Sequence, residues 1–216
     1  MALKVKDPVS GLTHSAGVLL SITGLVILVY LAAIKSSVWH IVSFSIYGTS
    51  MILLYMASSL YHLLSLTPKK NLLLRKIDHI MIFLLIAGTY TPITLIALRG
   101  IWGWSIFGIV WALAIAGVVV KIFFLNAPRL LSTFLYLGMG WLIVVAIFPL
   151  TRTVPPGGLI LLLAGGMLYS IGALLYALKW PGANSRYFGF HEIFHLFVLG
   201  GSLCHFWLML KYIMYL

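Results

Sequence analysis

Seven apolar stretches, each long enough to cross a lipid bilayer, constrain this chain more than any other feature. A transmembrane helix needs about 20 mostly apolar residues, because each residue adds only about 1.5 Å along the helix axis. Short connections that contain charges, glycine or proline separate the stretches, as expected for the turns between membrane helices. The approximate ranges are 15–34, 38–65, 72–98, 101–124, 129–148, 158–178 and 190–214.

The composition excludes a soluble fold. Hydrophobic residues make up 62% of the 216 residues and charged residues only 8%, whereas soluble domains carry about 25% charged residues. No connection is long enough to form a separate domain, so we predict a single all-α domain, residues 1–216, built as a bundle of seven transmembrane helices. We expect the first stretch to be a retained transmembrane helix rather than a signal peptide. The single cysteine, Cys204, excludes an internal disulfide and is expected to be a packing residue.

The distribution of lysine and arginine predicts the orientation in the membrane. Counted on alternate sides of seven helices, ten basic residues fall on the side of the N-terminus and four on the opposite side. Cytoplasmic connections carry the excess of positive charge in membrane proteins. The sequence therefore predicts a cytoplasmic N-terminus and a C-terminus outside. The first group is Lys4, Lys6, Lys69, Lys70, Arg75, Lys76, Lys121, Arg129, Lys179 and Arg186; the second is Lys35, Arg99, Arg152 and Lys211.

The net charge of +11 does not indicate nucleic-acid binding. The basic residues occur one to four at a time between apolar stretches, with no basic face and no aromatic-basic platform of the kind that binds nucleic acid. We therefore expect membrane lipids as partners and no nucleic acid. The oligomeric state stays open.

The last apolar stretch contains histidines and a carboxylate at membrane depth. Ionisable groups there are costly and mark a functional site by default. His191 and His195 are four residues apart, which places both imidazoles on one helix face, one turn apart. Two histidines at this spacing can share one zinc ion. Two interpretations remain open at this point: a metal site, or two histidines whose hydrogen bonds are satisfied at a helix end.

Other helices bring polar residues to the same membrane depth. With seven alternating spans, the first, third and seventh helices begin on the side where the second ends. Residues of catalytic or metal-binding type therefore converge there from four helices, which is a stronger signal than any one motif. They are His14 on the first helix, Ser58 and His62 on the second, Asp78 and His79 on the third, and His191, Glu192 and His195 on the seventh.

His62 is the natural third metal ligand of this group. It would complete a three-histidine site with an open fourth position, which is typical of catalytic zinc. Ser58 lies one turn before His62 on the same helix face. Asp78 is costly to leave charged in the bilayer and needs a partner, which could be the metal-bound water, a histidine or Ser58. A pair with Arg75 or Lys76 at the helix start is the alternative.

The string H191-E-I-F-H195 also satisfies H-E-x-x-H, in which the glutamate is the general base of a zinc peptidase. Two observations disfavour a peptidase. Nothing after His195 lies at a depth suitable for a third ligand, and successive helix positions differ by about 100°, so Glu192 need not face the metal. We expect Glu192 to cap the first helical turn instead.

The remaining histidines have other expected roles. His205 is ten residues past His195, about 15 Å along the helix axis, and cannot join the same metal. It is expected to be a buried, hydrogen-bonded residue or a pocket wall. His40, at the opposite membrane boundary, is expected to be structural. His14 and His79 could orient the ligand histidines by hydrogen bonds.

These motifs together resemble the hemolysin III family, the bacterial branch of the progestin and adipoQ receptor superfamily. The resemblance rests on S58-x-x-x-H62, on Asp78, on H191-x-x-x-H195 and on the N-terminal D7-P-x-S-x-x-T-H14-x-x-G17, in which Asp7 stands where many members have glutamate. It covers nearly the whole chain, and the order of the motifs on seven helices makes it specific.

The resemblance implies a zinc ion held by His62, His191 and His195, with Ser58 and Asp78 near its water as catalytic residues. It also implies the same orientation as the charge count, in a bacterial plasma membrane. Related receptors and alkaline ceramidases suggest zinc-dependent hydrolysis of a lipid amide, with an amide-linked lipid or a fatty acid as ligand and a role in membrane lipid homeostasis. The alternative is a non-enzymatic haemolysin, or a ligand-sensing receptor in which zinc is structural.

Overall fold

The structure, a computed structural model, describes residues 6–124, 129–182 and 188–216. Within these ranges all regular secondary structure is helical, and seven segments are long and apolar enough to cross a membrane. The protein is therefore a multi-pass membrane protein, as the sequence predicts. The helices are α1 (Pro8–Lys35), α2 (Val38–Leu63), α3 (Pro68–Pro92), α4 (Ile101–Phe123), α5 (Arg129–Trp141), α6 (Ile147–Thr153), α7 (Pro156–Leu178) and α8 (Phe190–Lys211).

Three of the seven spans are composite. A π-helical turn, η1 (Ile93–Ala97), extends α3; a 3-10 turn, η2 (Leu142–Ala146), joins α5 to α6; and η3 (Ile213–Tyr215) follows α8. The predicted spans are confirmed in number and order. The first helix begins at Pro8, seven residues before the predicted start, because proline fits the first helical position, where its missing N–H needs no partner.

The junction of α3 and α4 shows how the chain departs from regular helix. Pro92 has no N–H to donate within α3, and the α-helical pattern changes to the π turn directly after it. Gly100 then takes a φ of 119°, which favours glycine, and precedes the first residue of α4. Gly103 passes so close to the Thr94 carbonyl that a Cβ at this position would overlap the oxygen.

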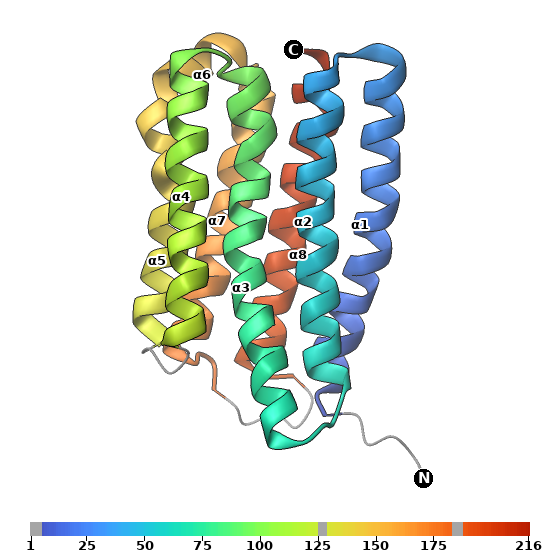
Figure 1. Cartoon of the computed structure of the whole chain (residues 1–216), viewed down its shortest axis with the longest axis vertical. Coiled ribbons are helices and arrows are strands. Elements are labelled where there is room, and N and C mark those ends of the chain that lie inside the picture. The colour runs from blue at the N-terminus through green and yellow to red at the C-terminus, as the bar shows by residue number, and fades with distance from the viewer. Residues whose placement is uncertain (1–5, 125–128, 183–187) are drawn as a thin grey trace.

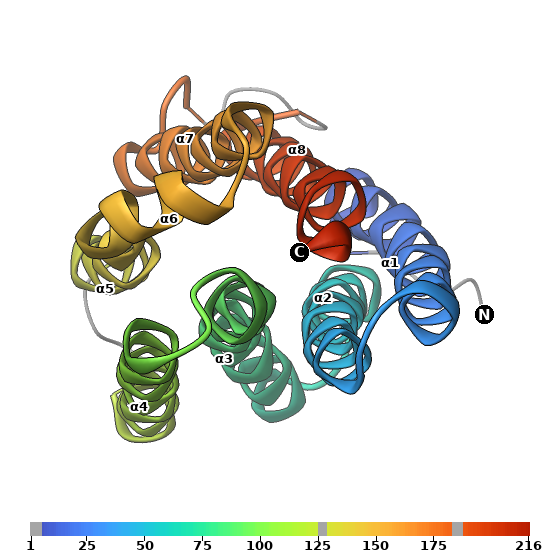
Figure 2. The same cartoon turned by 90° about the horizontal axis from the view of Figure 1, so that it is seen from above.

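The seven spans run side by side along the long axis of the molecule, with the two termini at opposite ends (Figure 1). Seen from above, most of them form a ring in which α8 closes onto α1 (Figure 2). Contacts link α1 with α2, α2 with α3, α3 with α5, α5 with α7, α7 with α8 and α8 with α1. Helix α4 lies outside this ring against α3. The ring brings α8, the span richest in histidine, between α1 and α7.

The surface and the interior match a lipid environment. Large apolar side chains such as Leu19, Phe148 and Ile160 are exposed on the outer faces of the helices, where lipid tails rather than water would cover them. The interior instead contains buried polar side chains, among them Thr91 and Thr94, whose hydroxyls donate to carbonyls one turn earlier in their own helix. These two hydroxyls are thus satisfied within their own helix, without water.

Candidate functional site

Four helix ends meet at the end of the molecule that carries the N-terminus (Figure 1). They are the starts of α1, α3 and α8 and the end of α2. A backbone hydrogen bond fixes two of them together, since the N–H of Asp7, the residue before α1, donates to the His62 carbonyl at 2.9 Å. The polar residues that the sequence places at one depth are therefore gathered at one end of the fold.

Three histidines from two helices face one another at this end. One ring nitrogen from each of His62, His191 and His195 lies within 4.8 Å of the others. The Nε2 atoms of His62 and His191 are 3.1 Å apart, close to the roughly 3.4 Å between two nitrogen ligands of one tetrahedral zinc ion. His62 and His195 are buried. The three side chains thus lie close enough together that they could hold a single metal ion.

The outer nitrogens of two of these histidines are held by hydrogen bonds. The Nδ1 of His62 is 3.0 Å from the Asp7 carboxylate, and the Nδ1 of His195 is 3.2 Å from the Ser10 carbonyl. Both partners are acceptors, so both Nδ1 atoms carry the proton and both Nε2 atoms keep a free lone pair. Metal-binding histidines are oriented in this way in known sites. The donor set therefore fits zinc.

The start of α1 supplies these orienting contacts, which the sequence did not indicate. The Ser10 hydroxyl also donates to Glu192 at 2.8 Å, and the other Glu192 oxygen accepts from the Gly189 N–H at 2.8 Å. Glu192 thus caps the first turn of α8, as predicted, and both of its oxygens are engaged there. Its placement gives no support to a peptidase in which this glutamate is the base.

His14 does not orient a ligand histidine by the hydrogen bond that we expected of it. Its ring instead stacks on His195, with centroids 3.7 Å apart and planes within 13°. The Ser10 carbonyl occupies the Nδ1 of His195 because Ser10 lies one turn nearer the start of α1. His79 faces the same interior space, and its carbonyl accepts a hydrogen bond from Tyr136.

Ser58 and Asp78 lie together beside the histidines. Both side chains line the same interior space, which leaves Ser58 as the candidate partner of Asp78. Within the described ranges Asp78 has no lysine or arginine at ion-pair distance, and Lys76 turns away to the Ile122 carbonyl. The helix-start ion pair that the sequence left open is therefore not formed.

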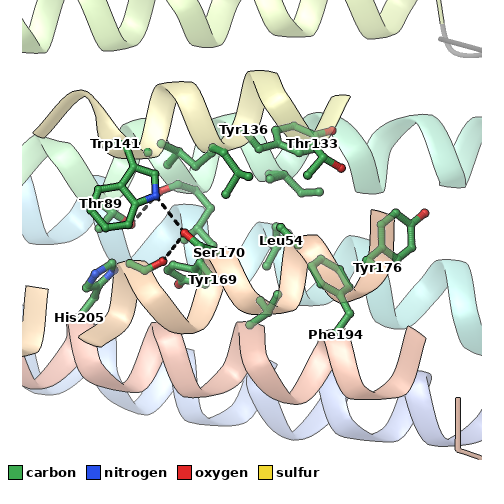
Figure 3. Close-up of a pocket in the computed structure, with 18 of the residues that line it drawn as sticks. Leu54, Thr89, Thr133, Tyr136, Trp141, Tyr169, Ser170, Tyr176, Phe194 and His205 are labelled. Carbon is green, nitrogen blue, oxygen red and sulfur yellow. Dashed lines mark hydrogen bonds between the residues drawn. The ribbon is translucent and has the colours of Figure 1, made fainter. Parts of the chain in front are cut away.

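An apolar cavity of about 410 Å³ begins at this cluster and runs along the inside of the helix ring. Ser58, Asp78, His191 and His195 line one end of it. Figure 3 shows part of this wall, with Phe194 and Tyr176 on one side of the view and Trp141 on the other. A long, narrow, mostly apolar space of this kind fits the tail of a lipid.

Two basic side chains lie at the polar end of this cavity, and one of them, Lys121, was interpreted from the sequence only as a topology signal. Arg75 and Lys121 both line the cavity, and Lys121 is only 2% exposed, with its ammonium donating to Ser132. A lysine at a helix end usually extends to the interface. The contact of α4 with α5 encloses this one instead.

The two remaining histidines behave as expected. His40 contacts the Ser37 hydroxyl through Nδ1 and the Ile213 carbonyl through Nε2, so it ties the start of α2 to the end of the chain. His205 is both hydrogen bonded, to the Leu162 carbonyl, and part of the cavity wall.

Comparison with known proteins gives the family of this chain. The family model described as "Haemolysin-III related" matches residues 3–206. The chain belongs to this family. Among its haemolysin-III relatives, "Hemolysin-3 homolog" from Bacillus subtilis (strain 168) is 47% identical over 96% of this chain and 95% of its own length. "Hemolysin-3" from Bacillus cereus is 45% identical over 97% of this chain and 93% of its own.

A more distant relative comes from a different kingdom. The human "Monocyte to macrophage differentiation factor" is 25% identical over 81% of this chain and 72% of its own length. The resemblance to the hemolysin III family is thereby confirmed, and the haemolysin-III chain has relatives well beyond bacteria. The family does not by itself fix what the histidine cluster binds.

Proposed function

We propose that this protein is a zinc-dependent hydrolase that cleaves the amide bond of a membrane lipid. The observation that carries the proposal is the position of the Ser58–Asp78 pair and the histidines at one end of a lipid-sized apolar cavity. A structural metal site needs no carboxylate and no substrate space beside it. A hydrolase needs both.

His62, His191 and His195 are the residues that would hold the zinc ion, with Asp7 and Ser10 fixing the orientation of two of them. When bound, zinc supplies a Lewis acid that polarises the amide carbonyl and lowers the pKa of water. Two of the three histidines, His191 and His195, line the cavity wall. A lipid whose tail occupies the cavity would therefore present its amide group to them.

Asp78 is the general base in this proposal. It accepts a proton from the attacking water and returns one to the leaving amine as the carbon–nitrogen bond breaks, which yields a fatty acid and an amine. Ser58 lines the same end of the cavity, where its hydroxyl would donate to the Asp78 carboxylate and orient it. The surrounding apolar wall keeps bulk water out, which strengthens the effect of both groups.

Replacement of Asp78 by asparagine tests the catalytic role. Asp78→Asn keeps the volume of the side chain and a hydrogen-bonding oxygen for Ser58 but removes the base. We expect a folded, zinc-loaded variant whose release of fatty acid falls at least about 100-fold, a usual contribution of general acid–base catalysis. The assay supplies short- and long-chain ceramides and other N-acyl lipids to the protein in detergent and measures free fatty acid.

Thr23→Ala is the control, because Thr23 lies on α1 with its hydroxyl bonded to the Leu19 carbonyl, exposed and remote from the cavity. It should hydrolyse lipid amides at the wild-type rate. Equal release by wild type and Asp78→Asn, or release that survives removal of the metal, would contradict the mechanism. Zinc bound without release from any N-acyl lipid would favour the alternative of a haemolysin or receptor with a structural metal.

A further inference from the structure

A second polar cluster lies in the part of the cavity that is remote from His191 and His195. Figure 3 shows Trp141, Tyr169, Ser170 and His205 gathered there, away from Tyr176 and Phe194. His205 follows His195 by ten residues on α8, which corresponds to about 15 Å along the helix. A cavity that merely held a saturated tail would need no polar groups at this depth.

Most polar groups of this cluster are satisfied by one another. The Trp141 indole N–H donates to the Ser170 hydroxyl at 2.9 Å, and Ser170 in turn donates to the Gly166 carbonyl. The Tyr169 hydroxyl is 2.8 Å from the Ser202 hydroxyl, which also accepts from Tyr55 at 2.6 Å. These contacts hold the side chains of α2, α5, α7 and α8 in fixed positions around the end of the cavity.

His205 is the exception. Its Nε2 is 3.3 Å from the Leu162 carbonyl and therefore carries the proton, which leaves Nδ1 as a hydrogen-bond acceptor. This Nδ1 is buried and has no hydrogen-bond partner among the residues that the structure describes. The side chain is 6% exposed and lines the cavity.

The orientation of the His205 ring is fixed by packing. The edge formed by Cδ2 and Nε2 lies against Gly165 of α7, where a Cβ would come within 2.5 Å of both atoms. Nδ1 is on the opposite side of the ring and so points away from this contact. Tyr169 packs beside the ring, with centroids 5.4 Å apart. A buried acceptor held in this way favours any ligand that brings it a donor.

We propose that this end of the cavity binds a hydroxyl group carried partway along the tail of the lipid ligand. The hydroxyl donates to Nδ1 of His205 while the head of the same molecule lies at the Ser58–Asp78 end. The ligand class is accordingly a hydroxylated fatty acyl chain rather than a plain one. The identity of the head as an amide rests on the proposed function above. The site for the hydroxyl at His205, called the tail site below, rests on the cavity alone.

Competition between two fatty acids tests the tail site without any turnover. Purified protein is mixed with equal amounts of two acids of the same length, one plain and one with a hydroxyl in the middle of its chain, and native mass spectrometry reports the bound ratio. We expect wild type to favour the hydroxylated acid by about tenfold, as one additional hydrogen bond to a buried acceptor allows.

Three variants define the origin of the preference. His205→Leu should bind both acids equally, and His205→Gln, which keeps an acceptor oxygen, should retain part of the preference even if the leucine variant does not fold. His40→Leu should keep the wild-type ratio, because His40 is a buried histidine outside the cavity. Two results would overturn the tail site. One is equal binding of the two acids by wild type, as expected if a trapped water donates to the acceptor. The other is an unchanged ratio in the His205 variants.

Matched N-acyl lipids with and without the hydroxyl separate this proposal from the proposed function. Faster release of the hydroxylated acid by wild type, lost in His205→Leu, supports both. Equal hydrolysis of the two amides together with an even binding ratio leaves the hydrolase and removes the tail site. Absence of hydrolysis together with a preserved binding preference removes the hydrolase and leaves the tail site.

Discussion

At the scale of single residues, the site depends on contacts around the three histidines as much as on the histidines. Asp7 holds the Nδ1 of His62, and the Ser10 carbonyl holds that of His195. Each contact fixes which nitrogen carries the proton and therefore which one can bind a metal. The start of α1 is thus part of the site although it contributes none of the three histidines.

Removal of the Asp7 carboxylate should weaken metal binding. We expect Asp7→Ala to lower zinc affinity by about 10- to 100-fold, since His62 would lose the acceptor that orients it. Competition with a chelator of known affinity measures this. Asp7→Asn keeps an acceptor oxygen, so its zinc affinity should lie between those of wild type and Asp7→Ala. Wild-type affinity in Asp7→Ala would show that His62 is oriented without this contact.

The sequence predicts the depth of a site residue in the membrane but not the side chains that it contacts, and the reason is physical. The depth of a side chain in a membrane follows from its distance along a helix, so the sequence placed His62, Asp78 and His191 at one level. Which other side chains a residue contacts at that level depends on which helices pack side by side. The pairing of Asp7 with His62 and the enclosure of Lys121 follow from such packing, and nothing in the local sequence reports it.

At the scale of helices, the spans and their order could be read from hydropathy, whereas the type of helix within each span could not. Apolar stretches predict a helix without showing whether its hydrogen bonds are α, π or 3-10. The π turn after Pro92 and the 3-10 turn between α5 and α6 therefore appear only in the structure. Both lie in spans that contribute residues to the cavity wall, among them Ile93 and Ile143.

The close approach of α4 to the π turn gives a prediction at this scale. A Cβ on Gly103 would lie 2.1 Å from the Thr94 carbonyl oxygen, a backbone atom that cannot rotate aside. We expect Gly103→Ala to destabilise the protein by about 1–3 kcal/mol, as overpacking does. Gly108→Ala on the same helix is the matched control, because nothing lies within 4 Å of its Cβ. Thermal unfolding in detergent compares the two, and equal melting temperatures would contradict this packing.

At the scale of the whole molecule, seven spans place the termini at opposite ends, with the histidine cluster at the end of the N-terminus (Figure 1). The distribution of basic residues predicts that this end is cytoplasmic. The cavity would then receive its ligand at the inner leaflet.

Reporter fusions test this orientation. A phosphatase that requires the outer compartment should be active when fused after Leu216 and inactive when inserted at residues 69–71, between α2 and the body of α3. The reverse pattern would place the histidine cluster at the outer face and move the proposed hydrolysis to the outer leaflet.

The central claim is that His62, His191 and His195 together hold one zinc ion, and the metal content of purified protein tests it most directly. We expect about one zinc per chain in wild type, and loss of most of it in each of His62→Ala, His191→Ala and His195→Ala, because three ligands are the usual number for an open zinc site. His205→Ala, a buried histidine of the same helix remote from the cluster, should keep its metal. Zinc at the wild-type level in all three ligand variants, or a wild type without bound metal, would contradict the account.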